Sequence, residues 1–241
     1  MEPRLQPAFT KDQIVLDRAG GGAVAVPEAH RVLRNTYWLL AISMLPAVVG
    51  AFVGLQFNLA GLYRSNPILA PILMIAILFG ALFGVSALRN TAWGVPALLA
   101  FTFIAGATLA PNLSVALGFR NGGQLIALAA GLTAAVFFAM ATIATVSKRD
   151  FSFLGKFLFV GLILLLVAMV ANLFFQIPAL ALTLSVIAVG IFSVWILYDV
   201  SRIVNGGETN YIMATLSIFL DLLNLFVNLL NILMILSGQR D

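Results

Sequence analysis

The sequence predicts an all-α membrane protein that crosses the bilayer several times. Of its 241 residues, 62% are hydrophobic and only 9% are charged, and the mean hydropathy is +1.08. A soluble domain carries about 25% charged residues, so lipid must be the main solvent of this chain. A helix pairs its own backbone polar groups, which lipid cannot do, so the long apolar runs are predicted to be helices.

Seven apolar runs are long enough to cross the hydrocarbon, which takes about 20 residues of helix. The linkers between them are short and contain Asn, Gly, Pro or charged residues. Pro111-Asn112 interrupts the third run, which could otherwise continue to Leu117, and Gln176-Ile177-Pro178 forces the fifth and sixth runs into an antiparallel hairpin. The predicted spans are residues 37–56, 67–88, 93–110, 124–146, 154–175, 178–200 and 211–236.

Residues 1–30 are predicted to be a mobile polar tail with a hinge at Gly20-Gly21-Gly22, ahead of a transmembrane domain at 31–238. No apolar core precedes Tyr37, so residues 1–36 do not look like a cleavable signal peptide. The absence of cysteine excludes disulfides and thiolate metal sites, and the single histidine, His30, argues against a histidine-ligated metal.

The basic residues predict the orientation, because cytoplasmic loops are enriched in Lys and Arg. With seven spans, ten basic residues fall on the side of the N-terminus and three on the other, so the N-terminus is expected in the cytoplasm and the C-terminus outside. Their spread over short loops fits this topology role better than nucleic-acid binding. The first group is Arg4, Lys11, Arg18, Arg31, Arg34, Arg89, Lys148, Arg149, Lys156 and Arg202; the second is Arg64, Arg120 and Arg240.

Small residues recur in the helices at Gly50-xxx-Gly54 and Gly80-xxx-Gly84. Such spacing allows two helices to approach closely. We interpret both motifs as packing features without a functional role.

A carboxylate lies inside the last span. Asp221 belongs to a polar series, Ser217, Asp221, Asn224, Asn228 and Asn231, whose spacings of 4, 3, 4 and 3 place it on one stripe of a helix with 3.6 residues per turn. The asparagines could simply form hydrogen bonds between helices. An ionisable group near the bilayer centre costs roughly 2.5–3.5 kcal/mol, so Asp221 points to a functional site.

Asp199 closes the sixth span, just before the loop that leads to Asp221. It could be an interfacial acid or a local partner of Arg202. If the sixth helix continues to about Val204, however, Asp199 and Asp221 could reach similar depth on adjacent helices.

Two carboxylates in contact at low dielectric cannot both ionise cheaply, so they would share one proton and act as a pH-sensitive latch. Carboxylate and amide oxygens also suit a hard cation such as calcium. With only Asp199, Asp221 and weak oxygen ligands, transient passage fits better than high-affinity storage. Arg89, at the end of the second span, is a possible partner of the pair, although a snorkelling or topology role explains it equally simply.

Several segments resemble the Bax inhibitor-1 family. They are Tyr198-Asp199, the loop from Gly206 to Tyr211, the segment from Asp221 to Asn228, and, for a bacterial branch associated with a membrane-bound AAA protease, 30–37 and 150–154. The resemblance covers roughly 30–236. It implies seven helices, with the last one central and wrapped by two layers of three, and a pH-dependent calcium leak controlled by an aspartate pair at Asp199 and Asp221.

In described members of the family, an arginine inside the second span hydrogen-bonds the pair, and Arg89 is displaced from that place by about one residue. Because both acids are retained, the chain is expected to keep the ion chemistry, the protease association, or both.

Two functions therefore remain open. The first is a pH-sensitive cation leak channel of the bacterial inner membrane, with calcium as the expected ion. The second is a non-conducting modulator that contacts a membrane-bound AAA protease through its tail. An enzyme is not expected, because no nucleophile–histidine pair, phosphate-binding loop, cofactor motif or Gly-x-Gly-Asp context is present.

Overall fold

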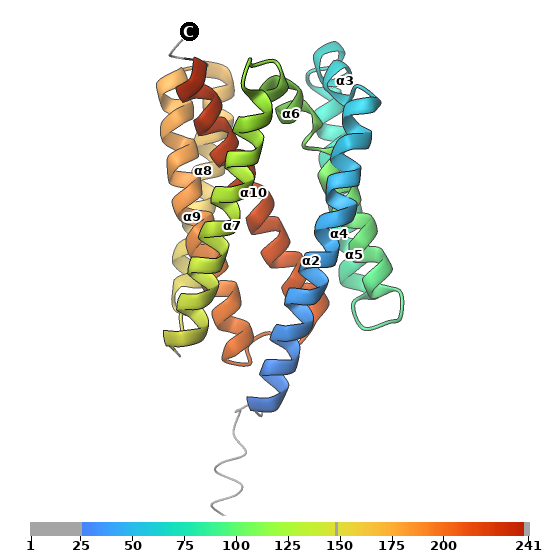
Figure 1. The fold of residues 1–241 in the computed structure, drawn as a ribbon, viewed down its shortest axis with the longest axis vertical. Helices are drawn as coiled ribbons and strands as arrows, with labels where there is room; N and C mark the ends of the chain where they lie inside the picture. The colour runs from blue at the N-terminus through green and yellow to red at the C-terminus, as the bar shows by residue number, and fades with distance from the viewer. Residues whose placement is uncertain (1–25, 148, 239–241) are drawn as a thin grey trace, which may run out of the picture.

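The computed structural model describes residues 26–147 and 149–238, and within these ranges the chain forms helices and no strands (Figure 1). Seven helical segments are long and apolar enough to cross a membrane, which confirms the predicted number of spans. The helices are α2 (Val26–Gln56), α3 (Leu59–Ser65), α4 (Leu69–Leu88), α5 (Gly94–Ala107), α6 (Ala110–Leu117), α7 (Gly122–Ser147), α8 (Leu154–Phe175), α9 (Pro178–Val204) and α10 (Tyr211–Gly238). The chain is a multi-pass membrane protein.

The largest differences from the predicted boundaries are in the first and third spans. The first helix begins at Val26 rather than Tyr37, so residues 26–30 of the predicted tail are helical. Residues 1–25, with Arg4, Lys11 and Arg18, lie outside the described residues, as do Lys148 and Arg240. The third span consists of α5 and α6 with a break at Thr108 and Leu109. The break precedes Pro111 because proline is accommodated in the first turn of a helix.

The last helix, α10, lies between two groups of helices (Figure 1). It packs mainly against α9 and α7 on one side and α2 and α5 on the other. Its buried residues include Ile218, Leu225 and Leu230, which are fully enclosed. The remaining spans lie farther out, since α4 packs mainly on α5 and α8 on α9, and both are largely exposed to the lipid. Helix α6 also touches α10, so α10 has five direct neighbours among the described helices.

The closest approach between two spans, α2 and α5, depends on glycine. A Cβ atom on Gly50 would strike the carbonyl oxygen of Phe103, and one on Gly106 would strike that of Ala47. Neither neighbour can yield without a shift of a helix backbone. Gly80 and Gly84, by contrast, have nothing within 4 Å of the added atom. The first glycine motif thus marks a helix contact, whereas the expectation of close packing at the second was wrong.

We expect Gly106→Ala to destabilise the protein by about 1–3 kcal/mol, because overpacking would force α2 and α5 apart. The measurement is thermal unfolding in detergent micelles. Gly84→Ala is the matched control and should melt at or slightly above the wild-type temperature, since alanine favours the helix and meets no neighbour. Equal melting temperatures for the two variants would contradict this account of the contact.

Candidate functional site

A tight hairpin at one end of the bundle holds the candidate site. Helix α9 continues to Val204, as the juxtaposition of the two acids requires, and α10 starts at Tyr211. Between them Gly206 adopts φ 75°, a left-handed conformation that glycine tolerates. The Asn210 side-chain oxygen then accepts hydrogen bonds from the backbone N–H groups of Ile212 and Met213, both at 3.0 Å, and so caps α10.

The two aspartates lie on adjacent, closely packed helices, and both are buried. Asp199 is 8% exposed and Asp221 is 7% exposed. Asp199 lies near enough to Asp221, and Arg202 and Glu208 near enough to Asp199, for their charges to interact. The Oδ2 atom of Asp221 is enclosed and has no hydrogen-bond partner among the described residues. Buried polar atoms in proteins are almost always paired, so this oxygen is placed to take a proton or a cation.

Arg202, rather than Arg89, is the cation near Asp199. Its guanidinium lies 5.6 Å from the ring centre of Tyr198, and one of its nitrogens is 3.7 Å from the Oε2 atom of Glu208. Tyr198 in turn makes an edge contact with Trp195 at 5.3 Å between ring centres. Trp195, Tyr198 and Arg202 thus form a row of contacts along one face of α9. The contact with Tyr198 holds the Arg202 guanidinium near Asp199.

The structure does not bring the Arg89 side chain to the pair. Arg89 ends α4, is exposed, and takes part in neither ion pair found among the described residues. Its contribution to the site is a backbone one, because its carbonyl oxygen accepts a hydrogen bond of 3.2 Å from the Asn210 side chain. Arg89 therefore links the end of α4 to the turn that precedes α10.

Trp195 is a residue that the sequence analysis missed. Its indole Nε1 is a buried donor without a partner among the described residues, and it lies one helical turn before Asp199. The spacing of four residues from Asp199 was a signal for its position, but the lack of a partner is visible only in three dimensions. An unpaired donor and an unpaired acceptor thus occur on the two helices that carry the acids.

The asparagines of the polar stripe bond to their own helix. Asn224 donates to the carbonyl of Leu220 and Asn228 to that of Asn224, both at 2.8 Å. These two amide nitrogens therefore do not form the hydrogen bonds between helices that the sequence also allowed. Because each nitrogen is held by the backbone, each amide oxygen is turned away from that carbonyl. Ser217 is partly buried on the same stripe, which therefore presents oxygen atoms on both sides of Asp221.

These oxygens do not form a compact metal centre. No group of three or more His, Cys, Asp or Glu side chains converges in 26–147 or 149–238. Calcium held tightly takes six to eight oxygen ligands, several of them carboxylates. Asp199 and Asp221 with neighbouring amide oxygens provide fewer than this number.

Comparison with known proteins shows the family of this chain. The family described as "Inhibitor of apoptosis-promoting Bax1" matches residues 29–238. The chain belongs to the Bax inhibitor-1 family. A protein of Escherichia coli K12 named "Modulator of FtsH protease YccA" is 39% identical over 204 residues, which cover 85% of this chain and 90% of that protein.

Two further relatives share the same extent. A membrane protein of Vibrio cholerae is 37% identical over 212 residues, 88% of this chain and 92% of that protein. A protein of Escherichia coli O6:H1 named "Inner membrane protein YccA" is 39% identical over 204 residues, 85% of this chain and 90% of that protein. The family match, over residues 29–238, includes the hairpin with the two acids.

We expect Arg202→Gln to lower the stability by about 1–3 kcal/mol, because it leaves the buried Asp199 without an opposite charge. Thermal unfolding in detergent measures this loss. Arg89→Gln is the matched control and should leave the melting temperature unchanged, since its side chain is exposed and outside the ion pairs of the described chain. The double variant Arg202→Gln, Asp199→Asn should recover most of the loss. A larger effect at Arg89 would reverse the assignment of the cation.

Proposed function

We propose that this protein is a pH-sensitive cation leak pathway of the bacterial inner membrane, with calcium as its ion and the Asp199–Asp221 pair as its gate. The observation that carries the proposal is the enclosed Oδ2 atom of Asp221, which has no partner among the described residues and lies within reach of the charge of Asp199. A purely structural polar residue would not need to be ionisable.

The gate follows from the cost of placing two negative charges in a low dielectric. While one proton is shared, the pair carries a single charge, which Arg202 offsets from the Asp199 side. When the proton leaves, the second charge repels the first across the α9–α10 contact. The polar stripe then offers a cation the carboxylate of Asp221 and the amide oxygens of Asn224 and Asn228 in succession along α10.

The proposed orientation places the α9–α10 turn in the cytoplasm. The excess of Lys and Arg at this end of the bundle favours it, with Arg89, Arg149 and Arg202 among the described residues. The N-terminus would then be cytoplasmic and the C-terminus outside. The name of one relative, an inner membrane protein, supports the location.

We expect purified protein in liposomes to pass calcium at a rate that depends on pH, and Asp221→Asn to abolish that dependence. The substitution keeps the side-chain shape but removes the ionisable group. Calcium entry is measured with an enclosed fluorescent indicator over a series of external pH values.

Asp150→Asn is the matched control for this experiment. Asp150 lies outside the spans and is fully exposed, and hydrogen bonds from Ser152 lower the pKa of its carboxyl group below the ordinary value. Its replacement should leave the pH profile of the wild type intact. Identical fluxes from wild type and Asp221→Asn at every pH would remove the proposed gate.

A second candidate function is modulation of a membrane-bound AAA protease. It is favoured by the 39% identity to a protein whose name states that role for the FtsH protease. In this role the chain would act as a non-catalytic partner, and its N-terminal residues would reach the protease from the cytoplasmic side. The two candidates can coexist, because the two acids and the proposed protease contact at residues 1–25 are different parts of the chain.

Removal of residues 1–25 should abolish crosslinking to the protease when both proteins are reconstituted in the same vesicles. It should also restore the rate at which the protease degrades a membrane substrate, if the full-length chain slows it. A chain with the same 25 residues in scrambled order controls for length and charge. Undiminished crosslinking after truncation would exclude the tail as the contact.

A further inference from the structure

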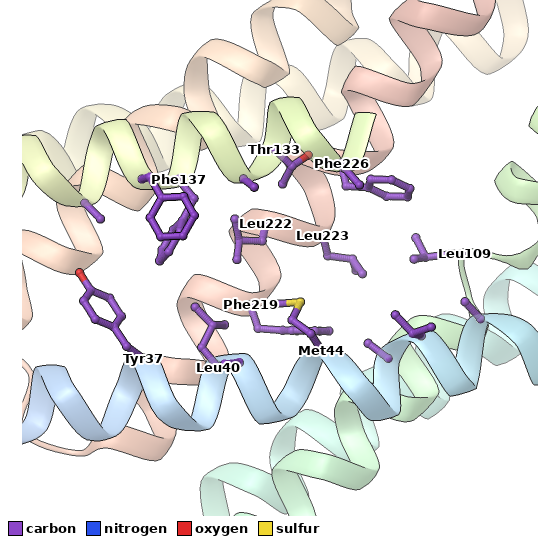
Figure 2. A pocket seen from close by; sticks show the side chains of 18 of the residues that line it. Tyr37, Leu40, Met44, Leu109, Thr133, Phe137, Phe219, Leu222, Leu223 and Phe226 are labelled. Atoms are coloured by element: carbon purple, nitrogen blue, oxygen red, sulfur yellow. The ribbon is translucent and has the colours of Figure 1, made fainter. Parts of the chain in front are cut away.

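A second feature of the bundle, a groove between α2 and α7, takes no part in the site described above. Its volume is about 820 Å³, and side chains of α10 form its floor. Figure 2 shows Tyr37, Leu40 and Met44 on one wall, Phe137 on the other, and Phe219 and Leu222 beneath them. Helices α2 and α7 both pack on α10. They meet each other where the rings of Tyr37 and Phe137 make an edge contact, with ring centres 6.0 Å apart, and the groove lies between the two helices.

The groove is open to the hydrocarbon of the bilayer. Val48 and Phe138, on opposite walls, are 68% and 66% exposed. The threonines that line the groove offer an occupant no free hydroxyl hydrogen. The hydroxyl groups of Thr133, Thr142 and Thr145 donate to carbonyl oxygens of their own helix at 2.8, 2.6 and 2.8 Å. An occupant must therefore be apolar along its whole length.

The groove has the length over which a lipid chain extends. Along α2 the lining runs from Tyr37 to Ala51, which is about 21 Å at 1.5 Å per residue. The hydrocarbon core of a bilayer is about 30 Å thick, so the groove spans the depth of one leaflet. An acyl chain is therefore the occupant that the surrounding bilayer itself supplies.

One end of the groove provides a positive charge. Tyr37 lines that end, and the neighbouring Trp38 is 69% exposed, which is typical of aromatic residues at the membrane interface. Arg34 precedes Tyr37 by three residues and so lies on the same face of α2. It is exposed and takes part in neither ion pair of the described ranges. A phosphate at the level of the lipid headgroups would meet its guanidinium.

We propose that the groove between α2 and α7 binds one acyl chain of an anionic phospholipid, whose phosphate group is bound by Arg34. The chain would lie against Phe219, Leu222 and Leu223, which flank Asp221 in the sequence of α10. The bound lipid would thus fill the space beside the helix that carries the buried acid. This binding site is separate from the proposed ion pathway and does not depend on it.

The test uses the full-length protein in phosphatidylcholine vesicles with a trace of phosphatidylglycerol that carries a photoreactive group on its acyl chain. After illumination, labelled peptides are identified by mass spectrometry. We expect labels on the groove faces of α2, α7 and α10. Arg34→Gln should reduce this labelling about fivefold, the effect of one basic residue at an anionic headgroup. The same probe on phosphatidylcholine should label the wild-type groove correspondingly less.

A substitution that fills the groove is the second arm. Ala134→Phe, or Ala41→Phe if the first does not fold, places a ring into the open space and should abolish labelling of the groove by either lipid. Both alanines are exposed in the groove, so neither substitution disturbs the core. Ala76→Phe, at an exposed position on α4, is the matched control and should have no effect.

Three results would overturn the proposal. The first is labelling spread evenly over the outer helices α4 and α8, which would indicate only bulk lipid. The second is equal labelling by the two lipids together with no effect of Arg34→Gln. The third is a change in crosslinking between copies of the chain, or to the protease, on filling the groove while lipid labelling stays the same. That last result would assign the groove to a protein helix.

Discussion

The rest of the structure depends on a carboxylate that is enclosed within a transmembrane helix. Asp221 cannot face lipid at an acceptable cost, so α10 must be surrounded by protein at that depth. The helices packed directly on α10, chiefly α9, α7 and α2, provide this enclosure. The hairpin turn sets the register of α9 and α10, so that Asp199 reaches the same region from the neighbouring helix. Arg202 then offsets the charge of Asp199, held by Tyr198 and Glu208.

The two sides of α10 serve different purposes in this account. The polar stripe carries Asp221 with Asn224 and Asn228, and the proposed ion pathway runs along it. The side with Phe219 and Leu222 forms the floor of an apolar groove between α2 and α7. With the proposed lipid in the groove, α10 packs against protein on one side and against lipid on the other. Lipid can follow a small movement of α10, so the movement would leave no empty space. This arrangement would allow a small change of charge at Asp221 to be accommodated by the bundle.

Hydropathy was sufficient to predict the number of spans, because lipid imposes the same requirement on each of them. It could not find the start of α2 at Val26, since that part of the helix extends into water with ordinary polar residues. The sequence also could not show that Arg202, rather than Arg89, is the cation near Asp199. The position of Arg202 depends on its contact with Tyr198 and on the conformation of the loop that carries Glu208. The bonds from Asn224 and Asn228 to their own helix depend on side-chain rotamers. The groove could not be predicted from the sequence, because its apolar residues are the same types that any lipid-facing surface contains.

The central claim is that Asp199 and Asp221 share a proton. It is tested most directly by infrared spectroscopy of the carboxyl groups, recorded over a pH titration of the protein in lipid nanodiscs. The account predicts one carboxylic acid signal assigned to the pair, whose titration shifts when either Asp199 or Asp221 alone is replaced by asparagine. Two signals that titrate independently, each unaffected by loss of the other residue, would contradict it.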